Sequence, residues 1–225
     1  MSSPHPHHWL LVELREPALT TAVTALTHTG GIVAVSVVAA VAVVWLVRMA
    51  RTAGAVLVAA AVLTGWPVMT LLKQFFDRDR PPQPERLLEL QTLSFPSGHA
   101  MMSAILATVF AVLAVRSWPA GSRLRLIALT ALGSYTVTVG LSRVYLGVHW
   151  LTDVVVGWLL GVLWALLWVW LITWAGGAPG VRPWRREPSA EPDLRSAPSA
   201  SCGAALQEEQ RGTQQAHGDS RHADG

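Results

Sequence analysis

Long apolar runs limit the fold of this chain more than any other feature. They cover roughly residues 31–47, 53–72, 98–115, 126–141 and 150–174, and short polar connections separate them. A helix needs about 17–25 mostly apolar residues to cross a bilayer, and each run reaches or nearly reaches that length. Charged residues make up 14% of the chain, whereas soluble domains carry about a quarter. The sequence therefore predicts an all-α fold, a polytopic bundle of transmembrane helices with five visible spans.

The two ends of the chain differ from this central part. Residues 1–30 start with a histidine-rich polar stretch, which we interpret as a disordered start rather than a metal site. Within them, residues 17–29 fit an amphipathic helix lying at the membrane interface. Residues 176–225 are rich in Gly, Pro, Ser, Glu, Gln and Arg, so they bury too little apolar surface to offset chain entropy. We expect an N-terminal interfacial segment (1–30), a transmembrane domain that carries the chemistry (31–175) and a disordered tail (176–225).

The arginines between the runs predict the orientation of the helices. They cluster in alternate connections, at Arg48 and Arg51, at Arg116, Arg123 and Arg125, and at Arg182, Arg185 and Arg186. Positively charged connections stay on the cytoplasmic side of a cell membrane. Loops 73–97 and 142–149 are therefore expected on the outer face and the C-terminal tail in the cytoplasm. Five spans would place the N-terminus outside, which is awkward without a signal sequence and is consistent with a missing upstream helix.

Charge argues against a nucleic-acid partner, and cysteine content argues against a disulfide or a cysteine-based zinc site. The formal net charge is +3 and the pI is near 9.7. The basic residues sit in short clusters between apolar runs, as membrane orientation requires, so a nucleic-acid partner is not expected. Cys202 is the single cysteine, which excludes a disulfide within the chain and a zinc site built on cysteines.

Three polar clusters lie in or beside the two outer loops. They run from Lys73 to Arg80-Pro81, over Pro96-Ser97-Gly98-His99, and from Ser142-Arg143 through His149 to Asp153. In the first cluster, Lys73 and Arg80 fit two interpretations. They are either ligands for an anion or interface anchors whose aliphatic stems lie along the lipid.

The second cluster directly precedes an apolar run. Ser97 is a preferred helix N-cap residue, and Gly98 lets a ligand approach the backbone. The free N–H groups at such a helix start bind anions. Without His99 an ordinary helix start would explain the cluster, but His99 places a titratable group at the anion site.

The third cluster pairs a histidine with a carboxylate. His149 and Asp153 are four residues apart and share a helix face. Asp153 is the only charged residue between His149 and Trp174, and an ionisable residue inside a span is costly and usually functional. Asp153 can fix the tautomer of His149 and leave the other ring nitrogen as a nucleophile or base. For this pair alone, a structural hydrogen bond is the alternative.

Taken together, the clusters supply three cations, a helix N-terminus and two histidines. The third cation is Arg143, whose planar guanidinium suits phosphate oxygens. Such a set suits in-line transfer of a phosphoryl group, in which one histidine attacks and the other protonates the leaving alcohol. The cations and N–H groups would hold the phosphoryl oxygens.

The clusters resemble the three signature motifs of the type 2 phosphatidic acid phosphatase family, K-x6-R-P, P-S-G-H and S-R-x5-H-x3-D. Every defining position is matched, and the resemblance covers about residues 17–175. It implies a helical membrane fold, usually of six spans, with an active site on the non-cytoplasmic side and no metal or other cofactor. The chain departs from the family in its five visible spans, because residues 17–29 resemble the interfacial stretch that normally follows the first helix.

The resemblance also implies a role for each motif residue. His149 is the implied nucleophile, Asp153 its orienting partner and His99 the general acid. The implied phosphate-binding residues are Lys73, Arg80, Ser97, Gly98 and Arg143. The expected partner is a lipid phosphate in the membrane, namely undecaprenyl diphosphate, phosphatidic acid or phosphatidylglycerophosphate. The sequence leaves the choice of lipid and the oligomeric state open.

Four other functions stand as alternatives. Vanadium haloperoxidases share similar motifs but are soluble, and the apolar runs argue against them. A membrane phosphotransferase of the same superfamily would pass the phosphoryl group to an alcohol instead of water. A non-enzymatic membrane protein would be expected to lack the nucleophile or a cation, and neither is missing. A metal-dependent hydrolase would use two histidines and an aspartate as zinc ligands.

Overall fold

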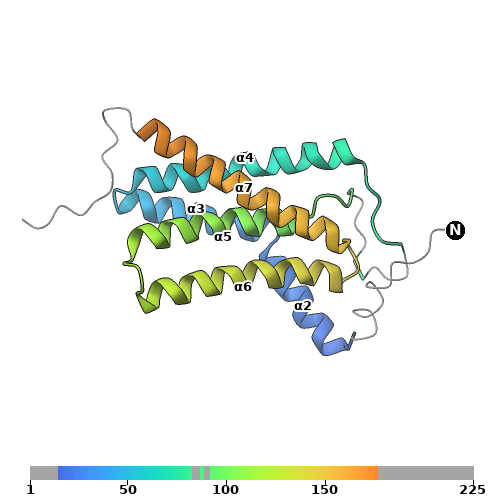
Figure 1. Cartoon of the computed structure of the whole chain (residues 1–225). Coiled ribbons are helices and arrows are strands. Elements are labelled where there is room, and N and C mark those ends of the chain that lie inside the picture. Colours follow the sequence, from blue (N-terminus) through green and yellow to red (C-terminus); the bar gives the residue numbers. More distant parts are fainter. Residues whose placement is uncertain (1–14, 83–86, 89–91, 177–225) are drawn as a thin grey trace, which may run out of the picture. The chain divides into compact units, whose positions relative to one another are not determined.

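The computed structural model describes residues 15–82, 87–88 and 92–176, and within them every regular element is an α-helix (Figure 1). The helices are α2 (Pro17–Thr29), α3 (Ile32–Arg48), α4 (Thr52–Phe76), α5 (Gly98–Ser117), α6 (Arg123–Tyr145) and α7 (Leu151–Gly176). The predicted all-α class is confirmed. The predicted disordered start (1–8) and the tail from residue 177 onward lie outside the described residues.

Four of these helices, α4 to α7, are each long and apolar enough to cross a membrane. The fifth candidate span is the pair α2 and α3, which meets the same criterion only when the two helices are taken together. They are bent by 47° at Gly30 and Gly31. The chain is therefore a multi-pass membrane protein with four or five candidate spans in its described part, in agreement with the predicted bundle.

Helix α5 lies in the middle of the helices and packs against α3, α4, α6 and α7 (Figure 1). Its side chains Met101, Met102, Ile105 and Val109 are all buried. Apolar side chains elsewhere point outward, as Leu63 does on α4 with 72% of its surface exposed. Apolar residues on the outside as well as the inside are what a bundle surrounded by lipid requires.

The closest helix packing joins α5 to α7 through glycines. A Cβ atom on Gly157 would lie 2.8 Å from the carbonyl oxygen of Ser97 and 3.1 Å from the Cβ of Ala100. Gly161 makes the same kind of contact one turn later, against the carbonyl of Met101. Small residues spaced four apart let two membrane helices approach this closely. The approach fixes the first turn of α5 beside the first turn of α7.

Helix α2 packs against α6 through polar contacts. The Tyr135 hydroxyl donates a hydrogen bond of 2.9 Å to the carbonyl of Thr29, and the Arg15 guanidinium donates two, of 2.8 and 3.1 Å, to the carbonyl of Tyr145. The predicted helix over 17–29 is confirmed, whereas its place at the membrane interface stays a prediction. Its packing on α6 was not foreseen, and this packing brings α2 to the site described next.

Candidate active site

The residues singled out from the three motifs meet at one end of the bundle. Lys73 lies in the last turn of α4 and Arg80 in the following loop, while His99 lies in the first turn of α5. The last turn of α6 carries Arg143, and the first turn of α7 carries Asp153. His149 stands in the short connection between α6 and α7. Elements that are far apart in sequence therefore share one polar region.

The pair His149 and Asp153 forms the buried centre of this region. Their side chains are 2% and 0% exposed, and Nδ1 of His149 lies 3.5 Å from Oδ2 of Asp153. On the other side of the ring, Nη1 of Arg80 lies 3.3 Å from Nε2 of His149. A guanidinium only donates hydrogen bonds, so Nε2 must be the acceptor. The arrangement therefore fits the tautomer with the proton on Nδ1 and a lone pair on Nε2.

Asp153 is held by more partners than the histidine. Arg78 donates to Oδ1 at 2.7 Å, and the Ser94 hydroxyl donates to Oδ2 at 2.5 Å. The backbone N–H of Trp150 also donates to Oδ2, at 3.0 Å. A carboxylate with several donors remains ionised and keeps a fixed direction. The Asp153 carboxylate is therefore fixed in a position from which it can orient the imidazole of His149.

Lys73 and Arg80 hold the segment that leads into α5. Lys73 Nζ donates to the carbonyl of Leu93 at 2.7 Å, and Arg80 Nε donates to the carbonyl of Thr92 at 2.6 Å. Arg80 also donates to the carbonyl of Val148 at 2.6 Å, next to His149. Backbone oxygens thus hold both cations, and Arg80 is held beside the imidazole of His149.

The start of α5 presents a buried hydroxyl and a close-packed glycine. Ser97 is fully buried, and its Oγ has no hydrogen-bond partner among the described residues. A Cβ on Gly98 would lie 3.2 Å from Cε of Met69. The backbone N–H of Ser97 donates to the carbonyl of Asp153 at 3.0 Å, which ties this helix start to α7. The first turn of α5 can therefore offer N–H donors and a hydroxyl to an anion beside His149.

Arg143 is buried, with 2% of its surface exposed. Its Nη1 donates to Oγ1 of Thr27 on α2 at 3.0 Å, while its Nε lacks a partner within the described residues. A buried guanidinium with an unused donor fits an arriving phosphate. His99 lies within electrostatic range of Arg143, His149 and Arg80. The two histidines and the cations are therefore close enough to act on one group.

Burial lowers the pKa of His149 from 6.5 to about 3. The hydrogen bond with Asp153 acts in the opposite direction, and the nearby cations Arg80, Arg143 and Lys73 add to the lowering. Burial therefore outweighs the effect of Asp153 on this pKa. The imidazole is neutral at physiological pH, as a nucleophile requires.

The motif analysis missed three residues of this region. Arg78 and Ser94 hold Asp153, and Thr27 receives a hydrogen bond from Arg143. Two signals were present in the sequence, since Arg78 falls inside the first cluster and Ser94 stands three residues before Ser97. Nothing in the sequence marks Thr27, because its role depends on how α2 packs against α6.

In the described part of the chain, no group of three or more His, Cys, Asp or Glu side chains is placed to hold a metal ion. The predicted absence of a cofactor stays a prediction.

A family model matches residues 52–176, and its description is the PAP2 superfamily. The chain belongs to the PAP2 superfamily. The match begins at α4 and ends with α7, so it contains all the motif residues discussed above. Membership makes the chain part of a family of membrane lipid phosphatases, in agreement with the resemblance found in the motifs.

Several proteins are similar to this PAP2 member. Phosphatidylglycerophosphatase B of Bacillus subtilis is 32% identical over 152 residues, which cover 68% of this chain and 74% of that protein. Undecaprenyl-diphosphatase of Sulfolobus acidocaldarius is 41% identical, but over only 69 residues, which are 30% of this chain and 28% of that protein.

Solved structures support the same membership. The crystal structure of a transmembrane PAP2-type phosphatidylglycerolphosphate phosphatase from Bacillus subtilis superposes with a TM-score of 0.69 at 29% identity, over 79% of this chain and 85% of that one. LpxE of Aquifex aeolicus superposes with a TM-score of 0.58 at 25% identity, over 72% and 92% of the two chains.

Proposed function

We propose that this protein hydrolyses the terminal phosphate of a membrane lipid through a phosphohistidine on His149. The observation that carries the proposal is the pair of contacts made by the two nitrogens of the imidazole. Asp153 lies at Nδ1 and a guanidinium donor lies at Nε2, so the nitrogen with the free electron pair points toward the cations. A phosphate bound by those cations meets the nucleophile directly.

The first step transfers the phosphoryl group to the enzyme. Nε2 of His149 attacks phosphorus in line with the ester oxygen, the N–P bond forms and the P–O bond to the lipid breaks. His99 donates its proton to the departing oxygen, so that the lipid leaves as a neutral alcohol or, from a diphosphate, as a monophosphate. Asp153 stabilises the positive charge that develops on the imidazole.

The second step releases the phosphate. Water attacks phosphorus from the side the lipid has left, His99 takes a proton from it, and the bond to Nε2 breaks. Inorganic phosphate departs and both histidines return to their starting states. During both steps the donors of Lys73, Arg80 and Arg143 and the start of α5 hold the charged oxygens.

Among the three expected lipids, phosphatidylglycerophosphate is the substrate we favour. Of the two relatives described above, the one that covers more of this chain carries that activity in its name, and so does the solved structure with the TM-score of 0.69. We further propose that the active-site end faces the outside of the cell membrane and the C-terminus the cytoplasm, because arginine clusters mark the opposite end.

Phosphate release from a panel of the three lipid phosphates tests the proposal. We expect the wild type to hydrolyse at least one of them and to form an acid-labile phosphoenzyme when the reaction is quenched early. His149→Ala should reduce turnover by at least about 10⁴-fold, as loss of a covalent nucleophile does. Thermal unfolding of the purified variant shows whether the fold is intact. Near-normal turnover by a folded His149→Ala protein contradicts the proposal.

A further inference from the structure

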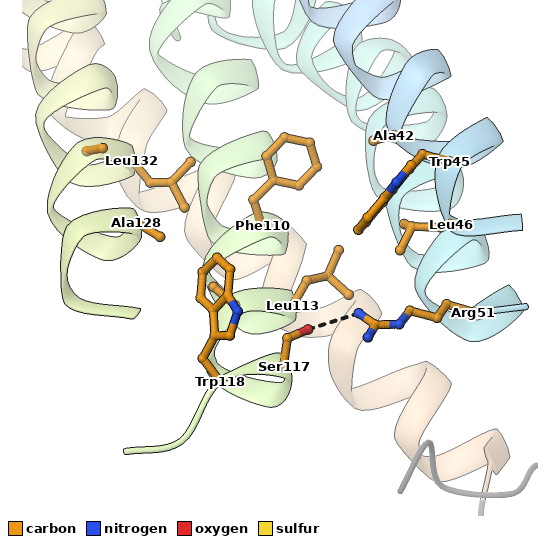
Figure 2. A pocket seen from close by; sticks show the side chains of 12 residues that line it. Ala42, Trp45, Leu46, Arg51, Phe110, Leu113, Ser117, Trp118, Ala128 and Leu132 are labelled. Carbon is orange, nitrogen blue, oxygen red and sulfur yellow. Dashed lines mark hydrogen bonds between the residues drawn. The ribbon is translucent and has the colours of Figure 1, made fainter. Parts of the chain in front are cut away.

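Helix α6 meets the helices that precede α4 beside the active site. At the opposite end of the bundle, a cavity of about 450 Å³ lies between α3, α5 and α6 (Figure 2). Its lining is mostly apolar, and each of the three helices contributes a large side chain, namely Trp45, Phe110 and Leu132. Helix α2, in contrast, packs directly against α6. The position of α2 beside the site therefore depends on its own contacts with α6.

Three residues on one face of α6 lie along the end of α2. They are Tyr135, Val139 and Arg143, which are spaced four residues apart. The Tyr135 hydroxyl donates a hydrogen bond of 2.9 Å to the carbonyl of Thr29, and a Cβ on Gly30 would clash with Cγ1 of Val139. The glycine therefore lets the backbone at the corner between α2 and α3 approach α6 closely. This approach brings the last turn of α2 to Arg143.

Thr27 makes the contact between α2 and Arg143. It is the one buried residue of α2, with 1% of its surface exposed. Its Oγ1 accepts a hydrogen bond of 3.0 Å from Nη1 of Arg143, across 116 positions of the chain. Thr27 lies outside residues 52–176, which match the family model. The family motifs therefore do not account for this contact.

The hydrogen bond to Thr27 restricts the direction of the Arg143 guanidinium. The group is planar and its donors have a fixed geometry, so holding Nη1 also directs the N–H at Nε. Nε is buried and has no hydrogen-bond partner among the described residues. A hydroxyl is a neutral acceptor, so Thr27 orients the cation without adding a negative charge that would repel an anion. Arg143 is thus held with a donor left for a phosphate oxygen.

We propose that Thr27 is a positioning residue for phosphate binding, because it holds Arg143 in the orientation from which Nε donates to the phosphoryl group. The inference rests on one part of the proposed function, the binding of phosphate by Arg143. Without the hydroxyl, the arriving anion has to immobilise the guanidinium itself. Immobilising one long side chain weakens binding by about fivefold. Thr27 acts through Arg143 and needs no contact with the substrate.

Binding of orthovanadate, a phosphate analogue, to the purified full-length protein tests this role. Calorimetry in detergent measures the Kd for vanadate and requires no turnover. Thr27→Val removes the acceptor and keeps the shape of the side chain, so we expect the Kd to rise about fivefold. Thr27→Ser keeps the hydroxyl and should keep the wild-type Kd.

Two control variants separate this role from a general loosening of α2. Tyr135→Phe removes the other hydrogen bond between the last turn of α2 and this face of α6. Thr24→Val removes a hydroxyl that donates to the carbonyl of Thr20 within α2. Both should keep the wild-type Kd, because Arg143 keeps its partner. Thermal unfolding shows which variants are folded. If Thr27→Val does not fold, Thr27→Cys makes the same comparison with Thr27→Ser, since a thiol is a weak acceptor.

Four results would overturn the proposal. An unchanged Kd in folded Thr27→Val shows that Arg143 needs no such partner. A loss in Thr27→Ser as large as in Thr27→Val shows that the hydroxyl is not the group that matters. An equal loss in Tyr135→Phe shows that Thr27 supports α2 rather than Arg143. A wild type that does not bind vanadate removes the anion site itself. A wild type that binds vanadate but releases no phosphate from any of the lipids contradicts the proposed hydrolysis and leaves the role of Thr27 standing.

Discussion

Substituting Gly157 by alanine should damage catalysis without touching a catalytic residue. The added Cβ would lie 2.8 Å from the carbonyl oxygen of Ser97, and ordinary contacts begin near 3.4 Å. Helix α7 must therefore move away from α5 by about 0.6 Å, since the backbone carbonyl cannot rotate aside. The hydrogen bond from Ser97 N–H to the Asp153 carbonyl, now 3.0 Å, would lengthen to about 3.6 Å, which is too long for a hydrogen bond.

The displacement separates the two halves of the site. The start of α5 carries His99, whereas Asp153 and the adjoining His149 move with α7. A misplacement of about 1 Å can cost about 10²-fold in rate, so we expect kcat to fall on the order of tenfold. Overpacking of this size also costs about 1–3 kcal/mol of stability.

Gly133→Ala is the matched control for this variant. Gly133 also lies within a helix, and a Cβ there meets nothing within 4 Å. Both substitutions raise the helix propensity by the same amount, about 1 kcal/mol. Any difference in kcat or stability between the two variants therefore reports the steric effect at Gly157. Phosphate release and thermal unfolding are measured on both proteins. If Gly157→Ala matches Gly133→Ala in kcat and in unfolding temperature, the packing argument is refuted.

Activity should survive EDTA and be inhibited by vanadate, and loss of activity in EDTA that zinc or magnesium restores would contradict the metal-independent mechanism. His99→Ala should slow the release of a lipid alcohol at least about tenfold more than that of an activated aryl phosphate, and equal losses would remove His99 as the general acid. Because the pKa of His149 is lowered to about 3, protonation of this residue should not reduce kcat/KM until the pH falls well below 6.5. A fall of kcat/KM near pH 6.5 that is caused by protonation of His149 would contradict the burial of this side chain. Cys202, the only thiol, should react with an impermeant reagent after lysis but not in intact cells; labelling of intact cells would invert the proposed orientation.

The sequence predicted the helices and the meeting of the motifs well because both depend on local rules. Apolar runs of spanning length define α4 to α7, and their alternation brings residues 73–82, 97–99 and 143–153 to the same end of the bundle. The pair His149 and Asp153 followed from helix periodicity alone. Their roles in catalysis remain proposals until the variants are measured.

Other features could not be read from the sequence because they depend on long-range packing. Arg78 reaches Asp153 across 75 positions of the chain, from an irregular loop without periodicity. Thr27 meets Arg143 only because α2 packs against α6. The lowered pKa of His149 is hidden from the sequence for the same reason, since the sequence shows the neighbouring carboxylate but not the depth of burial.

The contacts of Asp153 also set an order for biogenesis. Its donors Arg78 and Ser94 precede it in the chain by 75 and 59 positions, so they leave the ribosome well before α7. Until α7 enters the membrane, the polar groups of the earlier helices have neither His149 nor Asp153 beside them. Insertion of the last helix therefore assembles the site in one event, and a nascent chain that stops after α6 lacks both His149, the proposed nucleophile, and Asp153.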